Sequence, residues 1–201
     1  MTPAAAAGSG GAGVVIPLRS FRNAMRRLAG VLDPDERESL ARDLASRVRA
    51  AAGELPVAVI TDDPAVIDWA TANGCAVRSD PGSLDAAAAA GQAWAAERGL
   101  ARVVIAHADL PRATSFAAAT ADGAAPVAVV VPDHRDDGTP VLSIPTAVRF
   151  PFAYGPGSAA RHIAAAEALG LAVRVLHDPD LAFDIDLETD LAALTRAPGE
   201  P

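Results

Sequence analysis

Short runs of β-branched residues alternate along the chain with longer segments in which apolar residues recur every three or four positions. The runs occupy 14–16, 57–60, 103–105, 127–131 and 171–176. The first four runs are apolar on both sides, which is typical of a strand that helices cover on both faces. Strands that alternate with helices indicate βαβ units around a mostly parallel sheet. The pattern therefore predicts an α/β protein.

Helix signals occupy the stretches between these runs. Asp33 is a typical N-cap, Pro34 suits the first helical position, and apolar residues spaced by four predict a helix over 34–51. Asp63 and Pro64 open a second helix in the same way. The remaining helices are expected over 84–97, 158–169 and 188–194.

The length of 201 residues is enough for one α/β domain with a full hydrophobic core. The small residues over 1–13 predict a flexible N-terminal leader, and the Pro and Gly residues over 197–201 predict a flexible tail. The single domain is expected to span 14–196.

Composition and charge narrow the class of protein. No stretch approaches the roughly 18 consecutive apolar residues of a membrane span, and the start carries no basic residue of a signal peptide, so we expect a soluble cytoplasmic protein. A net charge of −8 argues against nucleic acid as a partner. The single Cys75 excludes a disulfide framework and a multi-cysteine zinc site, and the absence of lysine excludes any mechanism that needs one.

Carboxylates stand where strands are expected to end. Asp109 follows the run 103–105 closely, at the carboxyl end of a strand, where ligands bind in open α/β sheets. Asp184 and Asp186 are two positions apart, so in an extended segment their side chains point the same way. The three could hold Mg²⁺, which prefers oxygen ligands. The spacing is equally compatible with Asp186 as a helix cap and Asp109 as a turn residue.

A glycine-rich segment opens the helix expected at Ser158. In the sequence Tyr-Gly-Pro-Gly-Ser over 154–158, backbone amides and the Ser158 hydroxyl converge on the positive end of a helix, which is a natural seat for an anion. An ordinary glycine turn with Ser158 as N-cap is the alternative. His107 lies near the expected carboxylates, and we assign it a structural or supporting role.

Taken in order, these segments resemble the family of 2-phospho-L-lactate or phosphoenolpyruvate guanylyltransferases of deazaflavin coenzyme F-420 biosynthesis. The resemblance covers 14–194 and is carried by the segments 32–37, 80–82, 108–111, 138–139, 154–158 and 184–186. It implies a single Rossmann-like, MobA-like nucleotidyltransferase domain of the glycosyltransferase-A type, with helices on both faces of the sheet and GTP over the N-terminal half.

The resemblance also implies a reaction and its partners. The phosphate of a small carboxylic acid attacks the α-phosphorus of GTP, releases pyrophosphate and leaves a guanylylated acid, so no protein nucleophile is needed. The acid is phosphoenolpyruvate, which we prefer, or 2-phospho-L-lactate, and the cofactor is Mg²⁺. The downstream deazaflavin transferase is a candidate protein partner, while nucleic acid and membrane are not expected.

The resemblance implies a functional role for each residue of this chain that matches a family motif. The implied Mg²⁺ ligands are Asp109, Asp184 and Asp186. The implied nucleotide-binding residues are Pro17, Arg19, Arg27, Gly82 and Asp85. The implied catalytic residues are Arg19 and Asp109, and the residues implied to bind the acid are Thr139, Gly155 and Ser158.

Three of the positions that depart from the family pattern bear on substrate binding. Met25 and Arg19 stand where the family usually has lysines, and Pro140 follows Thr139 where the family often has an asparagine. A non-catalytic paralogue that binds a nucleotide or a partner protein is therefore an alternative to the active enzyme. A MobA-like nucleotidyltransferase with a different acceptor is another.

Overall fold

Seven strands form one sheet in the computed structural model, which describes residues 11–195. Their spatial order is β3-β2-β1-β4-β6-β5-β7, and β6 runs against both its neighbours while the other pairs are parallel. The strands are β1 (Ala12–Pro17), β2 (Val57–Ile60), β3 (Ala76–Arg78), β4 (Arg102–Ala106), β5 (Val127–Val131), β6 (Val141–Pro145) and β7 (Ala172–Val175). The expected mostly parallel sheet is confirmed.

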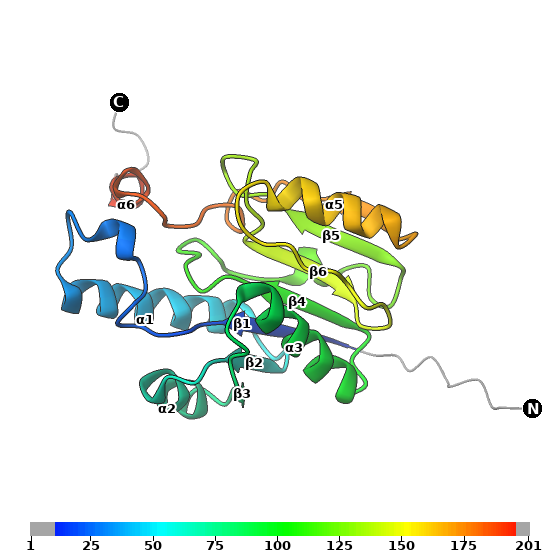
Figure 1. The fold of residues 1–201 in the computed structure, drawn as a ribbon, viewed down its shortest axis with the longest axis horizontal. Coiled ribbons are helices and arrows are strands. Elements are labelled where there is room, and N and C mark those ends of the chain that lie inside the picture. Colours follow the sequence, from blue (N-terminus) through cyan, green and yellow to red (C-terminus); the bar gives the residue numbers. More distant parts are fainter. Residues whose placement is uncertain (1–10, 196–201) are drawn as a thin grey trace, which may run out of the picture.

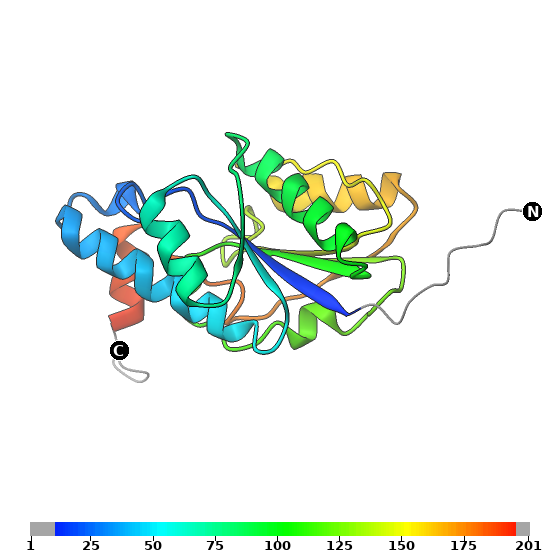
Figure 2. The same cartoon turned by 90° about the horizontal axis from the view of Figure 1, so that it is seen from below.

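Helices cover both faces of this sheet (Figure 1). The helices are α1 (Pro34–Ala51), α2 (Pro64–Ala72), α3 (Leu84–Glu97), α4 (Ala117–Thr120), α5 (Ser158–Ala168) and α6 (Glu188–Thr195), and a short 3-10 helix η1 spans Arg26–Leu28. One core cluster joins the sheet to α1, α2 and α4, and the other joins it to α3 and α5. Figure 2 shows α3 and α5 together on one side of the sheet.

The helix starts follow the capping signals of the sequence. The Asp33 carboxylate accepts hydrogen bonds from the backbone N–H groups of Asp35 and Glu36, and the Glu36 side chain accepts one from the N–H of Asp33, which completes a capping box. Asp63 caps α2 in a similar manner. The side chain of Ser83 accepts the backbone N–H of Ala86 at the start of α3, and the predicted bounds of α1 and α3 are both confirmed.

Two strands, β3 and β6, were not expected from the sequence. β3 has three half-buried residues at the edge of the sheet, too few to form a pattern. β6 is fully buried but contains Ser143 and ends at Pro145, so it lacks a continuous apolar run. β1 begins at Ala12, inside the expected leader, while the expectations for 1–10 and 196–201 concern residues outside those described.

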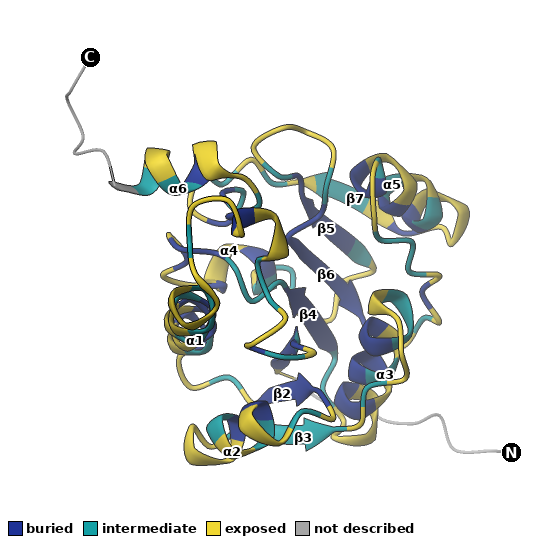
Figure 3. Ribbon diagram, turned by 60° about the vertical axis from the view of Figure 1, so that its left-hand side comes forward, coloured by how far each residue is buried: buried dark blue, intermediate teal, exposed yellow. Residues whose placement is uncertain are grey.

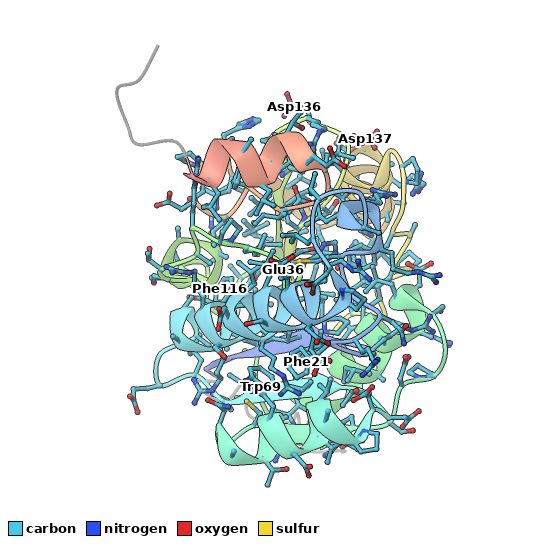
Figure 4. All side chains as sticks on the ribbon, turned by 90° about the vertical axis from the view of Figure 1, so that its left-hand side faces the viewer. Phe21, Glu36, Trp69, Phe116, Asp136 and Asp137 are labelled. Atoms are coloured by element: carbon cyan, nitrogen blue, oxygen red, sulfur yellow. The ribbon has the colours of Figure 1, made fainter. Side chains whose placement is uncertain are left out.

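The central strands are buried on both faces, as the dark blue strands of Figure 3 show. Along β1, Val14 and Ile16 belong to one core cluster and Val15 to the other. The first cluster extends to Phe21 and Trp69, whose ring centroids are 5.6 Å apart in an edge-to-face contact beside α1 and α2 (Figure 4). The parallel strands thus bring the loops that follow β1, β4 and β5 to a single edge of the sheet.

Helix α3 approaches β1 closely enough to require a glycine at position 91. A Cβ atom built on Gly91 would lie 2.3 Å from Cγ1 of Val15, far inside the contact distance of two carbon atoms. Any side chain there would push α3 away from the central strand.

We expect Gly91→Ala to lower the free energy of unfolding by about 1–3 kcal/mol, because the added methyl group overpacks the contact with Val15. The midpoint of urea denaturation measures the loss. In the Gly91→Ala background, Val15→Ala should cost less than it does alone, because it removes the clashing methyl groups. Strictly additive losses would contradict the packing argument.

Candidate functional site

A cavity of about 670 Å³ opens at the carboxyl edge of the sheet. Its walls are the loops that follow β1 and β4, the loop between β5 and β6, the segment before α5 and the segment 184–186. Most of the site residues implied by the sequence line it: Pro17, Arg19, Arg27, Asp109, Thr139, Gly155, Ser158, Asp184 and Asp186. The structure therefore gathers residues that are up to 169 positions apart.

Asp109 and Asp184 form the acidic part of the cavity. The backbone N–H of Ile185 donates to the carbonyl of Asp109 over 3.2 Å, which fixes the segment 184–186 beside the end of β4. Oδ1 of Asp109 and Oδ1 of Asp184 are both buried and accept no hydrogen bond within residues 11–195, although Nδ1 of His134 lies 3.4 Å and Nη1 of Arg135 lies 3.9 Å from Oδ1 of Asp184. Buried oxygen atoms without a donor are unusual in a folded protein and call for a ligand or a proton.

The electrostatics of these two carboxylates follow from their burial. Burial raises the pKa of Asp109, and the charge of Asp186 raises it further. Burial raises the pKa of Asp184 to about 6, with added repulsion from Asp109 and Asp186. The folded protein therefore holds clustered negative charge that a cation would relieve.

Asp186 is engaged in a different way. Its Oδ2 forms an ion pair with Nη1 of Arg27; the Asp186 side chain is about half exposed and that of Arg27 about two thirds. It does not cap α6, because the helix begins two residues later at Glu188 and the carboxylate of Asp186 binds Arg27, while Oδ2 of Asp190 accepts the backbone N–H groups of Asp186 and Leu187. The reading of Asp186 as a helix cap is therefore wrong.

The acidic residues are suited to a divalent cation without forming a finished metal site. Over residues 11–195, no three His, Cys, Asp or Glu side chains converge as a ready ligand set. Oδ1 of Asp109 and Oδ1 of Asp184, which accept no hydrogen bond, are nevertheless hard anionic ligands of the kind that Mg²⁺ selects. The residues present fit a cation held by few protein ligands, with the remaining ligands supplied by substrate and water.

Arginine side chains line another part of the cavity wall, in the loop after β1. Arg19, Arg26 and Arg27 border the cavity, and Nε of Arg19 donates to Oδ2 of Asp80 over 2.8 Å. Met25 also borders it, but its side chain packs against the apolar cluster around Leu28. The wall is therefore cationic through its guanidinium groups alone.

Gly82 and Asp85 do not line the cavity. Gly82 adopts a positive φ of 98° in the turn held by Asp80, whose Oδ1 accepts the Gly82 N–H over 2.9 Å. Oδ1 of Asp85 accepts the backbone N–H of Tyr154 over 2.7 Å. In this structure Gly82 belongs to the turn whose Asp80 binds Arg19, and Asp85 supports the segment that carries Tyr154.

The segment before α5 is held rigidly. The guanidinium group of Arg161 donates to the carbonyl groups of Ala153, Tyr154, Gly155 and Pro156. Such a clamp fixes one backbone path for the wall of the cavity.

Ser158 does not cap α5, so the reading as a serine N-cap is wrong. The N-cap position belongs to Gly157 in a left-handed conformation, and Ser158 is the first residue of the helix. Its Oγ lies 3.1 Å from Oγ1 of Thr139, and both side chains are buried at the cavity wall. The two hydroxyl groups form a pair across the gap between β6 and α5.

The backbone amides at the start of α5 are already used within the protein. The N–H of Gly157 donates to Oδ1 of Asp137, the N–H of Ser158 to the carbonyl of Gly155, and the N–H of Ala159 to the carbonyl of Asp137. An anion at this place would therefore meet the hydroxyl pair of Thr139 and Ser158 rather than these three amides.

His107 lies in the wall between the carboxylates and this hydroxyl pair. Its ring centroid is 5.5 Å from that of Tyr154. Nε2 of His107 and Oη of Tyr154 are buried and have no hydrogen-bond partner among the described residues. The structure thus places His107 at the cavity itself.

The sequence interpretation overlooked the residues that organise the walls. Asp133 accepts the backbone N–H groups of Arg135, Asp137 and Gly138 and so shapes the loop before Thr139. His162 contacts Thr139 from the middle of α5. The sequence does contain one indication of this contact: His162 is four positions after Ser158, so both side chains lie on the same face of the helix.

We expect Asp184→Asn to change the pH dependence of folding in a chelating buffer. The pKa of Asp184 is about 6 in the folded protein and near 4 in the unfolded chain, so wild-type stability falls as the pH rises between these values. The variant should be more stable than wild type by on the order of 1–3 kcal/mol above pH 6, and no more stable below pH 4. Urea denaturation at several pH values measures this, and a difference independent of pH would contradict the assignment.

Comparisons with known proteins agree on one family. The model of the family described as Guanylyl transferase CofC like matches residues 12–196. Phosphoenolpyruvate guanylyltransferase of Rubrobacter xylanophilus is 38% identical, with 92% of this chain and 94% of that protein covered. The protein of the same name from Chloroflexus aggregans is 35% identical, with coverage of 87% and 92%.

Solved structures of nucleotidyltransferases share the fold. A nucleotide-diphospho-sugar transferase from Desulfovibrio desulfuricans has a TM-score of 0.77 at 16% identity, covering 93% of this chain and 87% of that one. A nucleotidyl transferase from Methanothermobacter has a TM-score of 0.66 at 17% identity, with coverage of 91% and 95%. Across the described part of the chain, none of the helices has the length and apolar character needed to cross a membrane.

Proposed function

The chain belongs to the family of CofC-like guanylyl transferases, and we propose that it transfers the guanylyl group of GTP to the phosphate of phosphoenolpyruvate. The observation that supports this most directly is one cavity with three different walls. Arginines of the loop after β1, the aspartates at the end of β4 and the hydroxyl pair beside α5 all face it. The arginines suit the phosphates of a nucleoside triphosphate, the aspartates suit a cation, and the hydroxyl pair suits the carboxylate of a small acid.

In the proposed complex, Asp109 and Asp184 hold Mg²⁺, joined by Asp186 when it leaves Arg27. Bound Mg²⁺ neutralises phosphate charge and makes the α-phosphorus easier to attack. Arg19 and Arg27 bind the phosphates of GTP beside Pro17. Arg19 acts catalytically by stabilising the charge that develops on the leaving pyrophosphate.

In this reaction the main task of the protein is to position the two reactants. A phosphate oxygen of the acid forms a bond to the α-phosphorus, the bond from that phosphorus to the bridging oxygen breaks, and pyrophosphate leaves. The substrate supplies the nucleophile, so the protein needs neither a reactive serine nor a reactive cysteine. The guanylylated acid then passes to the biosynthesis of the deazaflavin coenzyme F-420.

The second substrate is proposed to bind through its carboxylate at Thr139, Gly155 and Ser158. This places the negative carboxylate next to hydroxyl donors and away from Asp109 and Asp184. We further propose that the reaction takes place in the cytoplasm and that the downstream deazaflavin transferase receives the product.

The test is pyrophosphate release by the purified protein with Mg²⁺ and each of four nucleoside triphosphates. Every triphosphate is combined with phosphoenolpyruvate, 2-phospho-L-lactate or 3-phosphoglycerate. We expect release only with GTP and phosphoenolpyruvate, and release with 2-phospho-L-lactate instead would replace the acid but keep the reaction. GTP binding by calorimetry with no release in any mixture would overturn the proposal in favour of a binding paralogue.

We expect Asp109→Asn to lower kcat by on the order of a hundredfold or more, because it removes a buried negative charge at the proposed cation site. Steady-state pyrophosphate release measures kcat. Asp136→Asn is the matched control, because Asp136 is exposed at the tip of the β5–β6 loop (Figure 4), and should leave kcat unchanged. Equal effects of the two variants would remove the assignment.

We expect Ser158→Ala to raise the KM for the acid by about tenfold, since a hydrogen bond to a charged group contributes about 1.5–3 kcal/mol. The KM for GTP should stay within about twofold. Initial rates over a grid of both substrate concentrations separate the two constants. An effect confined to GTP would mean that the carboxylate binds elsewhere.

A further inference from the structure

His162 lies behind the hydroxyl pair, sealed from solvent. It is fully buried in α5, and its ring packs against Tyr154 with centroids 4.8 Å apart. Nε2 lies 3.1 Å from the backbone N of Ala153, and Nδ1 lies 3.1 Å from Oγ1 of Thr139. Both ring nitrogens therefore have one defined partner.

The partner of Nε2 determines where the ring carries its proton. The backbone N–H of Ala153 can only donate, so Nε2 must accept with its lone pair. A neutral imidazole has one N–H, which is then on Nδ1 and donates to Oγ1 of Thr139. Burial lowers the pKa of His162 to about 4, so the ring is neutral at ordinary pH.

A count of protons shows what this tautomer does to the pair. His162, Thr139 and Ser158 bring three protons, one N–H and two O–H, to two internal contacts, so one hydroxyl proton is left over. Because the ring donates to Thr139, that spare proton cannot turn toward the ring. The opposite tautomer would accept from Thr139 and leave no proton for the cavity.

We propose that His162 is a positioning residue that makes the Thr139–Ser158 pair a hydrogen-bond donor to an anionic oxygen of the second substrate. This rests on the proposed function, in which that oxygen belongs to the carboxylate of the acid. The three nearby amides of Gly157, Ser158 and Ala159 are occupied within the protein. The spare hydroxyl proton is therefore a donor that this wall offers to an anion, beside the Oη–H of Tyr154, which has no hydrogen-bond partner among the described residues.

Two substitutions separate positioning from packing. His162→Gln can still accept the Ala153 N–H but no longer places a donor on Thr139, so the Thr139 proton becomes free to turn away from the cavity. His162→Asn can place its amide N–H near the position of Nδ1, but it cannot reach Ala153. We expect His162→Gln to raise the KM for the acid about tenfold and His162→Asn to raise it less than threefold. Neither should change kcat or the KM for GTP by more than about twofold.

Stability provides the contrasting measurement. His162→Asn leaves the buried N–H of Ala153 without an acceptor, so it should unfold at a lower urea concentration than His162→Gln. The variant that destabilises the protein more, His162→Asn, is therefore expected to be the one that raises the KM for the acid less. If the same variant caused the larger loss of stability and the larger rise in KM, the role of His162 would be merely structural and the proposal would be overturned.

The tautomer can be read without any enzymatic assay. Nitrogen NMR of the histidine rings, assigned with the two variants, should show a protonated Nδ1 and an unprotonated Nε2 for His162 in the substrate-free protein. A protonated Nε2 would overturn the inference. A double variant with Ser158→Ala should add nothing to the KM effect of His162→Gln, and additive effects would also overturn it.

Failure of this inference is distinct from failure of the proposed function. Absence of pyrophosphate release by the wild-type protein with every acid refutes the guanylyl transfer. Equal acid KM values for His162→Gln and His162→Asn in an active enzyme refute only the role of His162.

Discussion

The site depends on negative charge that the fold holds together at the end of β4. Asp109 and Asp184 come from distant parts of the chain, and burial raises both pKa values, with added repulsion from Asp186 on Asp109 and from Asp109 on Asp184. The backbone hydrogen bond from Ile185 to Asp109 keeps the segments joined despite that repulsion. The buried contacts between the sheet and the helices on its two faces hold these loop ends in place. Such an arrangement is unfavourable in the free protein and favourable once a cation is present, which is a common property of catalytic sites.

The other walls of the cavity complement this charge. The loop after β1 supplies guanidinium groups, and its ion pair between Arg27 and Asp186 shows that the two walls already attract one another. The wall beside α5 is different in kind, because its backbone amides are satisfied within the protein and its donor is a buried hydroxyl pair. A nucleotide and a small acid would therefore be recognised by separate physical means. For a reaction whose nucleophile comes with the substrate, this separation is what positions the reacting atoms.

Met25 and Pro140, which depart from the family pattern, have defined contacts in the structure. Met25 lies at the cavity in a left-handed backbone conformation and packs against apolar side chains, so it contributes no charge there. Arg19, Arg26 and Arg27 remain to carry the positive charge of that wall. Pro140 precedes β6, and its carbonyl accepts the backbone N–H of His107 over 2.9 Å. It thus helps to hold the residue that leads into Asp109.

The sequence by itself determined the α/β class, the caps that start α1 and α2, and the segments from which the site is built. These features are local, because capping residues and apolar runs act over a few positions. It missed β3 and β6, whose strand character comes from pairing with neighbours. Only the tertiary structure decided that Asp85 holds Tyr154, that Ser158 pairs with Thr139 instead of capping α5, and that His162 stands behind them. Each depends on which distant atoms meet at hydrogen-bond distance, and spacing along the chain does not contain that information.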